Sequence, residues 1–153
     1  MKWTHISGRL ERGVLARLAP GADLIESIEE VCRQMDFKCA AITSCIGSLR
    51  RADIMIAVPL ENKLGAGYSD PLTLEGPLEL LCAQGSVGED EEVGLFTHLH
   101  VTFSDRDSRV WGGHLLKGKG PVLVTCEVMI TALAGTRLRR QYDPEVELSI
   151  LKP

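Results

Sequence analysis

Three histidines whose spacing suits a shared metal ion are the chemically most informative residues of this chain: His98, His100 and His114. If residues 97–104 form a β-strand, successive side chains point to opposite faces, so His98 and His100 share one face. His114 follows two glycines, which allow the backbone to fold tightly and bring a third imidazole to the same point. Three nitrogen ligands with a fourth position open are typical of catalytic zinc sites. The sequence therefore predicts a divalent-metal site, with zinc as the favoured ion.

A carboxylate beside such an ion can serve as a fourth ligand or as a general acid and base. Glu127 is the first candidate catalytic residue, because it interrupts an otherwise apolar strand expected over residues 121–133. Glu79, in the segment PLELL, is the second. Either glutamate can equally be an ordinary paired side chain, and the His98-Leu-His100 pair can equally be a polar strand face. Whether the chain is an enzyme stays open.

Length and composition are those of one soluble globular domain, with 153 residues, 44% hydrophobic and 25% charged. No apolar stretch approaches the roughly 18 residues of a membrane helix, and the N-terminus lacks the apolar core of a signal peptide. The five cysteines are an odd number and form no CxxC pair, which indicates reduced, buried thiols. We expect a single cytoplasmic domain over residues 1–153 with no membrane partner.

The net charge of −4 bears on nucleic-acid partners. DNA-binding surfaces are generally basic, because neutralising phosphates dominates their affinity. Here the basic residues are scattered, apart from short groups such as Arg137–Arg140, and the acidic run Glu89–Glu92 counters them. The charge does not favour DNA binding by this chain alone, although a local patch in an oligomer can still provide it.

The elements that must position the histidines can be read from periodicity. Residues 23–35 predict a helix, because Asp23 and Glu26 resemble a capping box and apolar residues follow at helical spacing. Short connections between the other elements favour antiparallel pairing. The expected fold class is α+β, a sheet-rich single domain whose sheet is mostly antiparallel. Its expected strands are 13–20, 38–46, 53–58, 78–87, 97–104, 111–114 and 121–133, with a long loop over 59–77.

Several segments occur in an order that resembles the plants-and-prokaryotes-conserved (PPC) domain, from about Arg9 to about Leu148. They are GVLARLAPGADLIESI, AAITSCIGSL, LEGPLELLCAQGSV, THLHVTFSD, VWGGHLLKG and TCEVMI. The resemblance implies a central antiparallel sheet flanked by helices and assembly as a homotrimer. It also implies kinship with plant nuclear proteins in which an AT-hook contacts DNA, but this sequence lacks the hook. The implied fold is similar to that of acetolactate decarboxylase, which holds zinc with three histidines matching His98, His100 and His114.

Three hypotheses follow for the function. In the first, a homotrimer binds a divalent metal and then binds or transforms a small oxygen-rich molecule at a subunit boundary. In the second, the chain is a DNA-binding or DNA-associated regulatory protein that uses Arg139 and Arg140. In the third, the trimer is a structural assembly module and its histidines have no metal.

Overall fold

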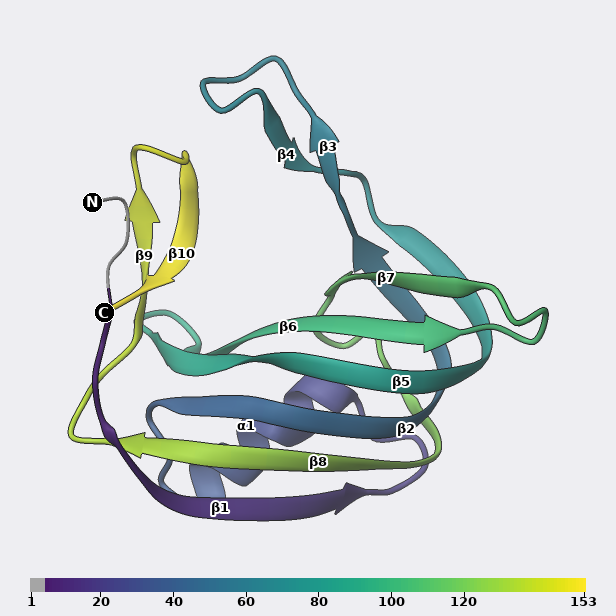
Figure 1. Cartoon of the computed structure of the whole chain (residues 1–153), viewed down its shortest axis with the longest axis horizontal. Helices are drawn as coiled ribbons and strands as arrows, with labels where there is room; N and C mark the ends of the chain where they lie inside the picture. Colours follow the sequence, from purple (N-terminus) through teal and green to yellow (C-terminus); the bar gives the residue numbers. More distant parts are fainter. Residues whose placement is uncertain (1–4) are drawn as a thin grey trace.

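The computed structural model describes residues 5–153 as one strongly curved sheet with a helix behind it (Figure 1). Eight strands follow one another in the order β1-β8-β2-β7-β6-β5-β9-β10, and β3 and β4 form a separate hairpin. The elements are β1 (Arg9–Leu18), α1 (Leu24–Gln34), β2 (Ala40–Met55), β3 (Ala57–Pro59), β4 (Ala66–Tyr68), β5 (Leu72–Asp90), β6 (Gly94–Ser104), β7 (Val110–Leu115), β8 (Val122–Ala134), β9 (Arg139–Asp143) and β10 (Leu148–Lys152).

Four strands of the sheet, β2, β5, β6 and β7, close into a ring. One edge of β2 pairs with β5. The other edge pairs with β7 at Ile54 and Met55, the C-terminal residues of β2. The ring is completed by β6, which pairs with both β5 and β7. Side chains of ring strands, such as Leu49, Leu80 and Phe103, belong to one buried cluster that also contains the apolar residues of α1.

The predicted helix is confirmed, with its ends displaced by one residue. The Asp23 carboxylate accepts hydrogen bonds from the backbone N–H groups of Ile25 and Glu26, both at 3.1 Å, and so caps the helix start. The buried face of α1, which includes Leu24 and Ile28, packs on β6, β8 and β1. The helix therefore covers one face of the sheet and leaves the opposite face free.

The expected α+β class with flanking helices is wrong. Strands make up 62% and helix 7% of residues 5–153, and α1 is the one helix in that range. A single helix is enough because the ring buries its own apolar side chains. Two finer expectations also fail: residues 40–55 form one continuous strand, and the segment expected as a loop over 59–77 contains most of the β3–β4 hairpin and the start of β5.

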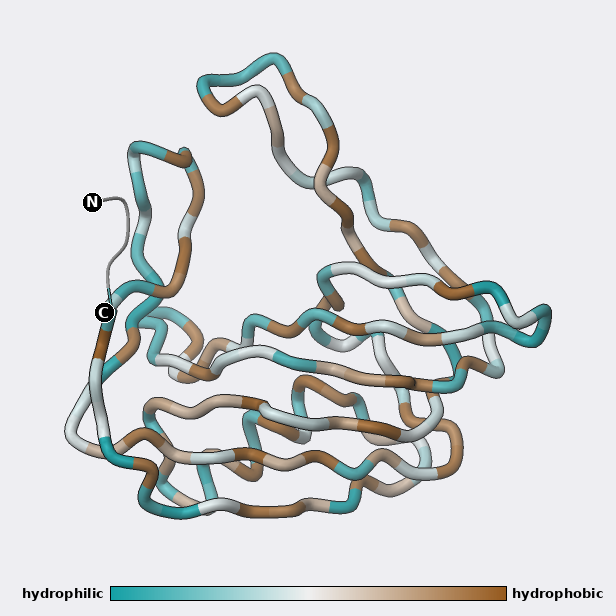
Figure 2. The backbone as a smooth tube through the Cα atoms, viewed as in Figure 1, coloured by the Kyte–Doolittle hydropathy of each residue, from teal (hydrophilic) through white to brown (hydrophobic). Residues whose placement is uncertain are grey.

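Two hairpins rise from the same side of the sheet, the β3–β4 arm (residues 57–68) and the β9–β10 hairpin (residues 139–152) (Figure 1). Lys63 at the tip of the arm donates a hydrogen bond from Nζ to the carbonyl oxygen of Pro144, at 3.1 Å. Figure 2 shows apolar stretches along both the arm and β10. Within residues 5–153, α1 is too short to cross a bilayer.

Candidate metal centre

Strands β6 and β7 place the three histidines on one face of the sheet. In the antiparallel pair His100 lies directly opposite His114, and His98 lies two residues along β6. The intervening residues Leu99 and Val101 are buried on the helix side. The predicted alternation along this strand is therefore confirmed, and the imidazoles of His98 and His100 point away from the core.

The glycine before His114 serves close packing and not the tight turn that the sequence suggested. A Cβ on Gly113 would lie 2.6 Å from the carbonyl oxygen of Met55, so β7 can approach the end of β2 only without a side chain there. The chain reversal lies earlier, where the Asp105 N–H donates to the carbonyl oxygen of Arg109 at 3.0 Å. The third imidazole therefore reaches the other two through strand register.

The ligand atoms of the three histidines all lie within 4.8 Å of one another. Nε2 of His98 and Nε2 of His100 are 3.1 Å apart. In a tetrahedral site with zinc–nitrogen bonds of about 2.0–2.1 Å, two nitrogen ligands are roughly 3.3 Å apart. The nitrogens of His98 and His100 are thus already close to the spacing of zinc ligands. The widest separation among the three ligand atoms would need to shorten by at most roughly 1.5 Å.

Electrostatics keep two of these imidazoles neutral. Burial, followed by the neighbouring His98 and His100, lowers the pKa of His114 to about 4. The pKa of His98 is lowered as well, by burial and then by His100. Because a metal binds the neutral imidazole, these two ligands need not release a proton near pH 7.

The ring of His114 also carries a polar atom that the protein does not satisfy. Its Nδ1 is buried and has no hydrogen-bond partner. Leaving such an atom unpaired costs about 1–3 kcal/mol, so structures that retain one often use it for a ligand. The donor set and this unsatisfied nitrogen fit a bound divalent ion.

A cavity of about 450 Å³ opens over two of the histidines. His100 and His114 line it together with Ile56, which directly precedes the arm, and with Leu64 and Tyr68 of the arm. The ring centroids of Tyr68 and His114 are 5.3 Å apart. Sequence reasoning did not predict Leu64 as a wall residue, because residues 59–77 were expected to form a loop. The recurrence of apolar residues within 57–68 was the feature of the sequence that could have indicated a structured, cavity-lining segment.

The two predicted glutamates do not join the histidine group. Glu79 lies on β5 opposite Ser104 and lines a different cavity, of about 310 Å³. Glu127 is exposed on β8, opposite Ile46 of β2. Three strand spacings separate β8 from β6 in this part of the sheet, or roughly 14 Å. A catalytic role for either residue stays a prediction.

Residues 5–134 match the family described as the Plants and Prokaryotes Conserved (PCC) domain. This chain belongs to that family, called PPC here. Two curated relatives, each named bifunctional protein GlmU and each from a Synechococcus strain, are 33% and 32% identical over 128 residues. The match covers 84% of this PPC chain, which spans only 18% of the length of those relatives.

Solved structures show the same fold. A metal-containing protein from Archaeoglobus fulgidus is 31% identical, with a TM-score of 0.84 over 99% of this chain and 100% of that one. A PPC protein from Pyrococcus horikoshii is 26% identical, with a TM-score of 0.79 over 99% and 98%. A candidate DNA-binding protein from Ralstonia eutropha is 26% identical, with a TM-score of 0.73 over 91% and 90%. The relation to the fold of acetolactate decarboxylase stays a prediction.

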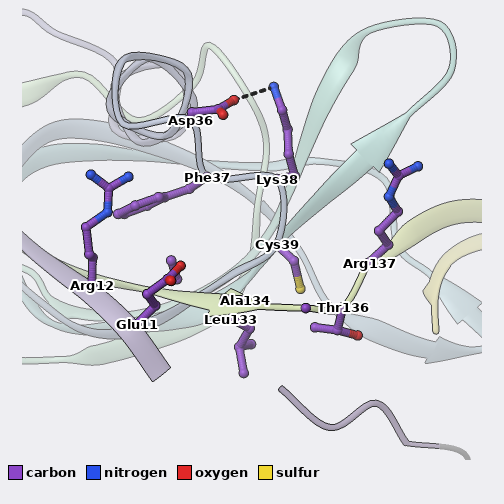
Figure 3. Close-up of a pocket in the computed structure, with 12 residues that line it drawn as sticks. Glu11, Arg12, Asp36, Phe37, Lys38, Cys39, Leu133, Ala134, Thr136 and Arg137 are labelled. Carbon is purple, nitrogen blue, oxygen red and sulfur yellow. Dashed lines mark ion pairs between the residues drawn. The ribbon is translucent and has the colours of Figure 1, made fainter. Parts of the chain in front are cut away.

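A second cavity of this PPC domain, of about 490 Å³, lies between β1, the end of α1 and the end of β8 (Figure 3). Three basic side chains line it, and two of them already have partners. Lys38 pairs with Asp36 at 2.9 Å, and Arg12 donates from Nη2 to the carbonyl oxygen of Met35 at 2.7 Å. None of the three clustered histidines lines this cavity, so it is separate from the candidate metal centre.

Proposed function

We propose that this PPC domain binds a divalent metal ion, with zinc favoured, through His98, His100 and His114, and that the open coordination positions bind a small oxygen-rich molecule. The observation that carries the proposal is the convergence of three imidazoles, with ligand atoms within 4.8 Å, from two strands onto one exposed face. The metal-containing relative from Archaeoglobus fulgidus supports it. When bound, the ion would polarise a carbonyl or carboxylate oxygen, or lower the pKa of bound water toward roughly 7.

The protein's own contribution is to hold the ligands in place and exclude water on one side. The β6–β7 register fixes His100 opposite His114, and burial keeps His114 neutral by lowering its pKa. Tyr68 lies beside the His114 ring and forms part of the wall of the cavity over it. A ligand would therefore reach the metal through the cavity.

The test is elemental analysis of protein purified without a histidine tag. We expect about one zinc-like ion per chain, with most of it lost in His98→Ala, His100→Ala and His114→Ala. His5→Ala is the matched control, because His5 is the fourth histidine and lies outside the group. Protein that stays metal-free after incubation with zinc would sink the proposal.

We also propose that the domain assembles as a homotrimer through the sheet face opposite α1. Large apolar side chains are exposed on that face, with Leu15 at 70%, Ile46 at 51% and Leu81 at 46%. Large apolar side chains exposed on one face are a feature of protein interaction surfaces. Sedimentation should give about three times the 16.7 kDa chain mass, and a mass unaffected by chelators together with absent metal would favour the pure assembly module.

DNA binding is the second candidate function, supported by the candidate DNA-binding relative from Ralstonia eutropha. One of the two arginines expected to contact DNA, Arg140, already has partners within the chain. Nη1 of Arg140 is 3.2 Å from Oδ2 of Asp90, and the guanidinium lies 4.4 Å from the Phe96 ring centroid. Arg139 is exposed. A salt-dependent shift of duplex DNA that weakens in Arg139→Ala would support this candidate, and no shift at low salt would exclude it.

A further inference from the structure

The cavity over the histidines has two chemically different ends. One end is formed by the imidazoles of His100 and His114. The rest is walled by apolar side chains from three parts of the chain, namely Met55 of β2, Leu64 of the arm and Leu148 of β10. A molecule that fits both ends must therefore carry a polar group at one end and apolar atoms at the other.

Charge limits the ligand further. No Lys, Arg, Asp or Glu among residues 5–153 lines this cavity. A phosphate, a second carboxylate or an ammonium group placed in the apolar part would lose its hydration without gaining a partner, which is strongly unfavourable. Sugar phosphates, nucleotides and dicarboxylates are therefore poor candidates for this cavity.

The volume of the cavity and the exposure of its wall residues indicate how large an apolar group it can hold. Its volume of about 450 Å³ lies within the range of roughly 300–1,000 Å³ that small-molecule sites occupy. Leu64, Tyr68 and Leu148 are all exposed although they line it. Covering these side chains with a ligand tail removes apolar surface from water, which is the driving force for binding there.

We infer that the molecule bound at the histidine centre is a monocarboxylate with an apolar tail, whose carboxylate coordinates the metal and whose tail lies under the β3–β4 arm. The inference rests on the proposed metal site and names its ligand class. A tail of several methylenes or a single aromatic ring matches the cavity. Tyr68, beside the His114 ring, would contact the first atoms of the tail.

Calorimetry on the zinc-loaded chain tests this with acetate, butyrate, hexanoate and octanoate. Each methylene that becomes buried should tighten binding by about fourfold. Octanoate should bind far more tightly than suberate, which has the same length but a second carboxylate. The visible spectrum of the cobalt-substituted protein should change on adding octanoate, because a carboxylate enters the coordination sphere.

Leu64→Ser and Leu60→Ser form a matched pair of variants. Both leucines lie on the arm and are similarly exposed, but only Leu64 lines the cavity. Leu64→Ser should weaken octanoate binding by roughly threefold to tenfold while leaving acetate binding and metal content unchanged. Leu60→Ser should change none of the three.

The outcomes separate the two proposals. A chain that takes up no metal overturns the metal site and this inference together. A metal-loaded chain that binds acetate and octanoate equally, or suberate as well as octanoate, overturns the tail cavity and leaves the metal site standing. If octanoate binds equally tightly without metal, the inference that its carboxylate coordinates the metal is wrong.

Discussion

His100 and His114 face each other directly across β6 and β7, with ring centroids 5.6 Å apart and ring planes at 86°. Because the side chains of a strand alternate between faces, a shift of one residue in this pairing would turn His114 to the core side. The candidate metal centre therefore depends on the close approach of β7 to β2, which closes the ring.

That dependence predicts the effect of adding a methyl group at Gly113. In Gly113→Ala the new Cβ would lie 2.6 Å from the carbonyl oxygen of Met55, so β7 must move away from β2. We expect the free energy of unfolding to fall by about 1–3 kcal/mol and zinc affinity to drop at least tenfold. Denaturant unfolding and zinc competition titrations measure these. Gly112→Ala is the comparison, since its Cβ would lie 3.0 Å from its nearest neighbour, and equal effects in both variants would contradict this explanation.

The lowered pKa values predict how the stability of the metal-free chain depends on pH. The pKa of His114 is about 4 in the folded state and close to 6.5 in an unfolded chain. Between these values the unfolded state binds more protons, so stability falls as pH drops from about 6.5 to about 4. Urea unfolding of chelator-treated protein across this range measures the slope. His114→Gln should show a shallower slope, and an unchanged slope would mean that other groups cause it.

Replacing Glu79 or Glu127 should not change the metal content of the chain. Glu79 and Glu127 lie outside the histidine group, so Glu79→Gln and Glu127→Gln should retain about one ion per chain. If either residue acts as an acid or base on a bound ligand, its variant should keep metal and ligand affinity and lose turnover. Loss of metal from either variant, measured by elemental analysis, would show that the carboxylate is a ligand after all.

An ion pair between α1 and the loop before β8 should contribute to stability. The side chain of Glu29 is 2% exposed and pairs with Nζ of Lys117, whose side chain is 48% exposed. Lys117→Met leaves the buried carboxylate without its partner and should lower the free energy of unfolding by about 1–3 kcal/mol. Lys119→Met, in the same loop, should change it by less than about 0.5 kcal/mol. Adding Glu29→Leu to Lys117→Met should restore part of the loss, and no recovery would argue against a buried charge as the cause.

The sequence alone determined the features that depend on near neighbours. The helix over 23–35 followed from its cap and apolar stripe, and the structure has it at Leu24–Gln34. The shared face of His98 and His100 followed from strand alternation. Both patterns act over a few residues, so composition and spacing were sufficient to predict them.

Only the tertiary structure decided the features that depend on distant pairing. Val124 alternates with its neighbours in the same pattern as the buried Val122 and Cys126, yet it is exposed. The cause is a register shift, in which Gly47 faces Cys126 while Leu49 faces Val122. The position of His114, the continuity of β2 and the cavity under the arm likewise follow from ring closure between segments far apart in the chain. Periodicity within one strand carries no information about which distant strand it pairs with or in which register, and these contacts decide where the third imidazole lies.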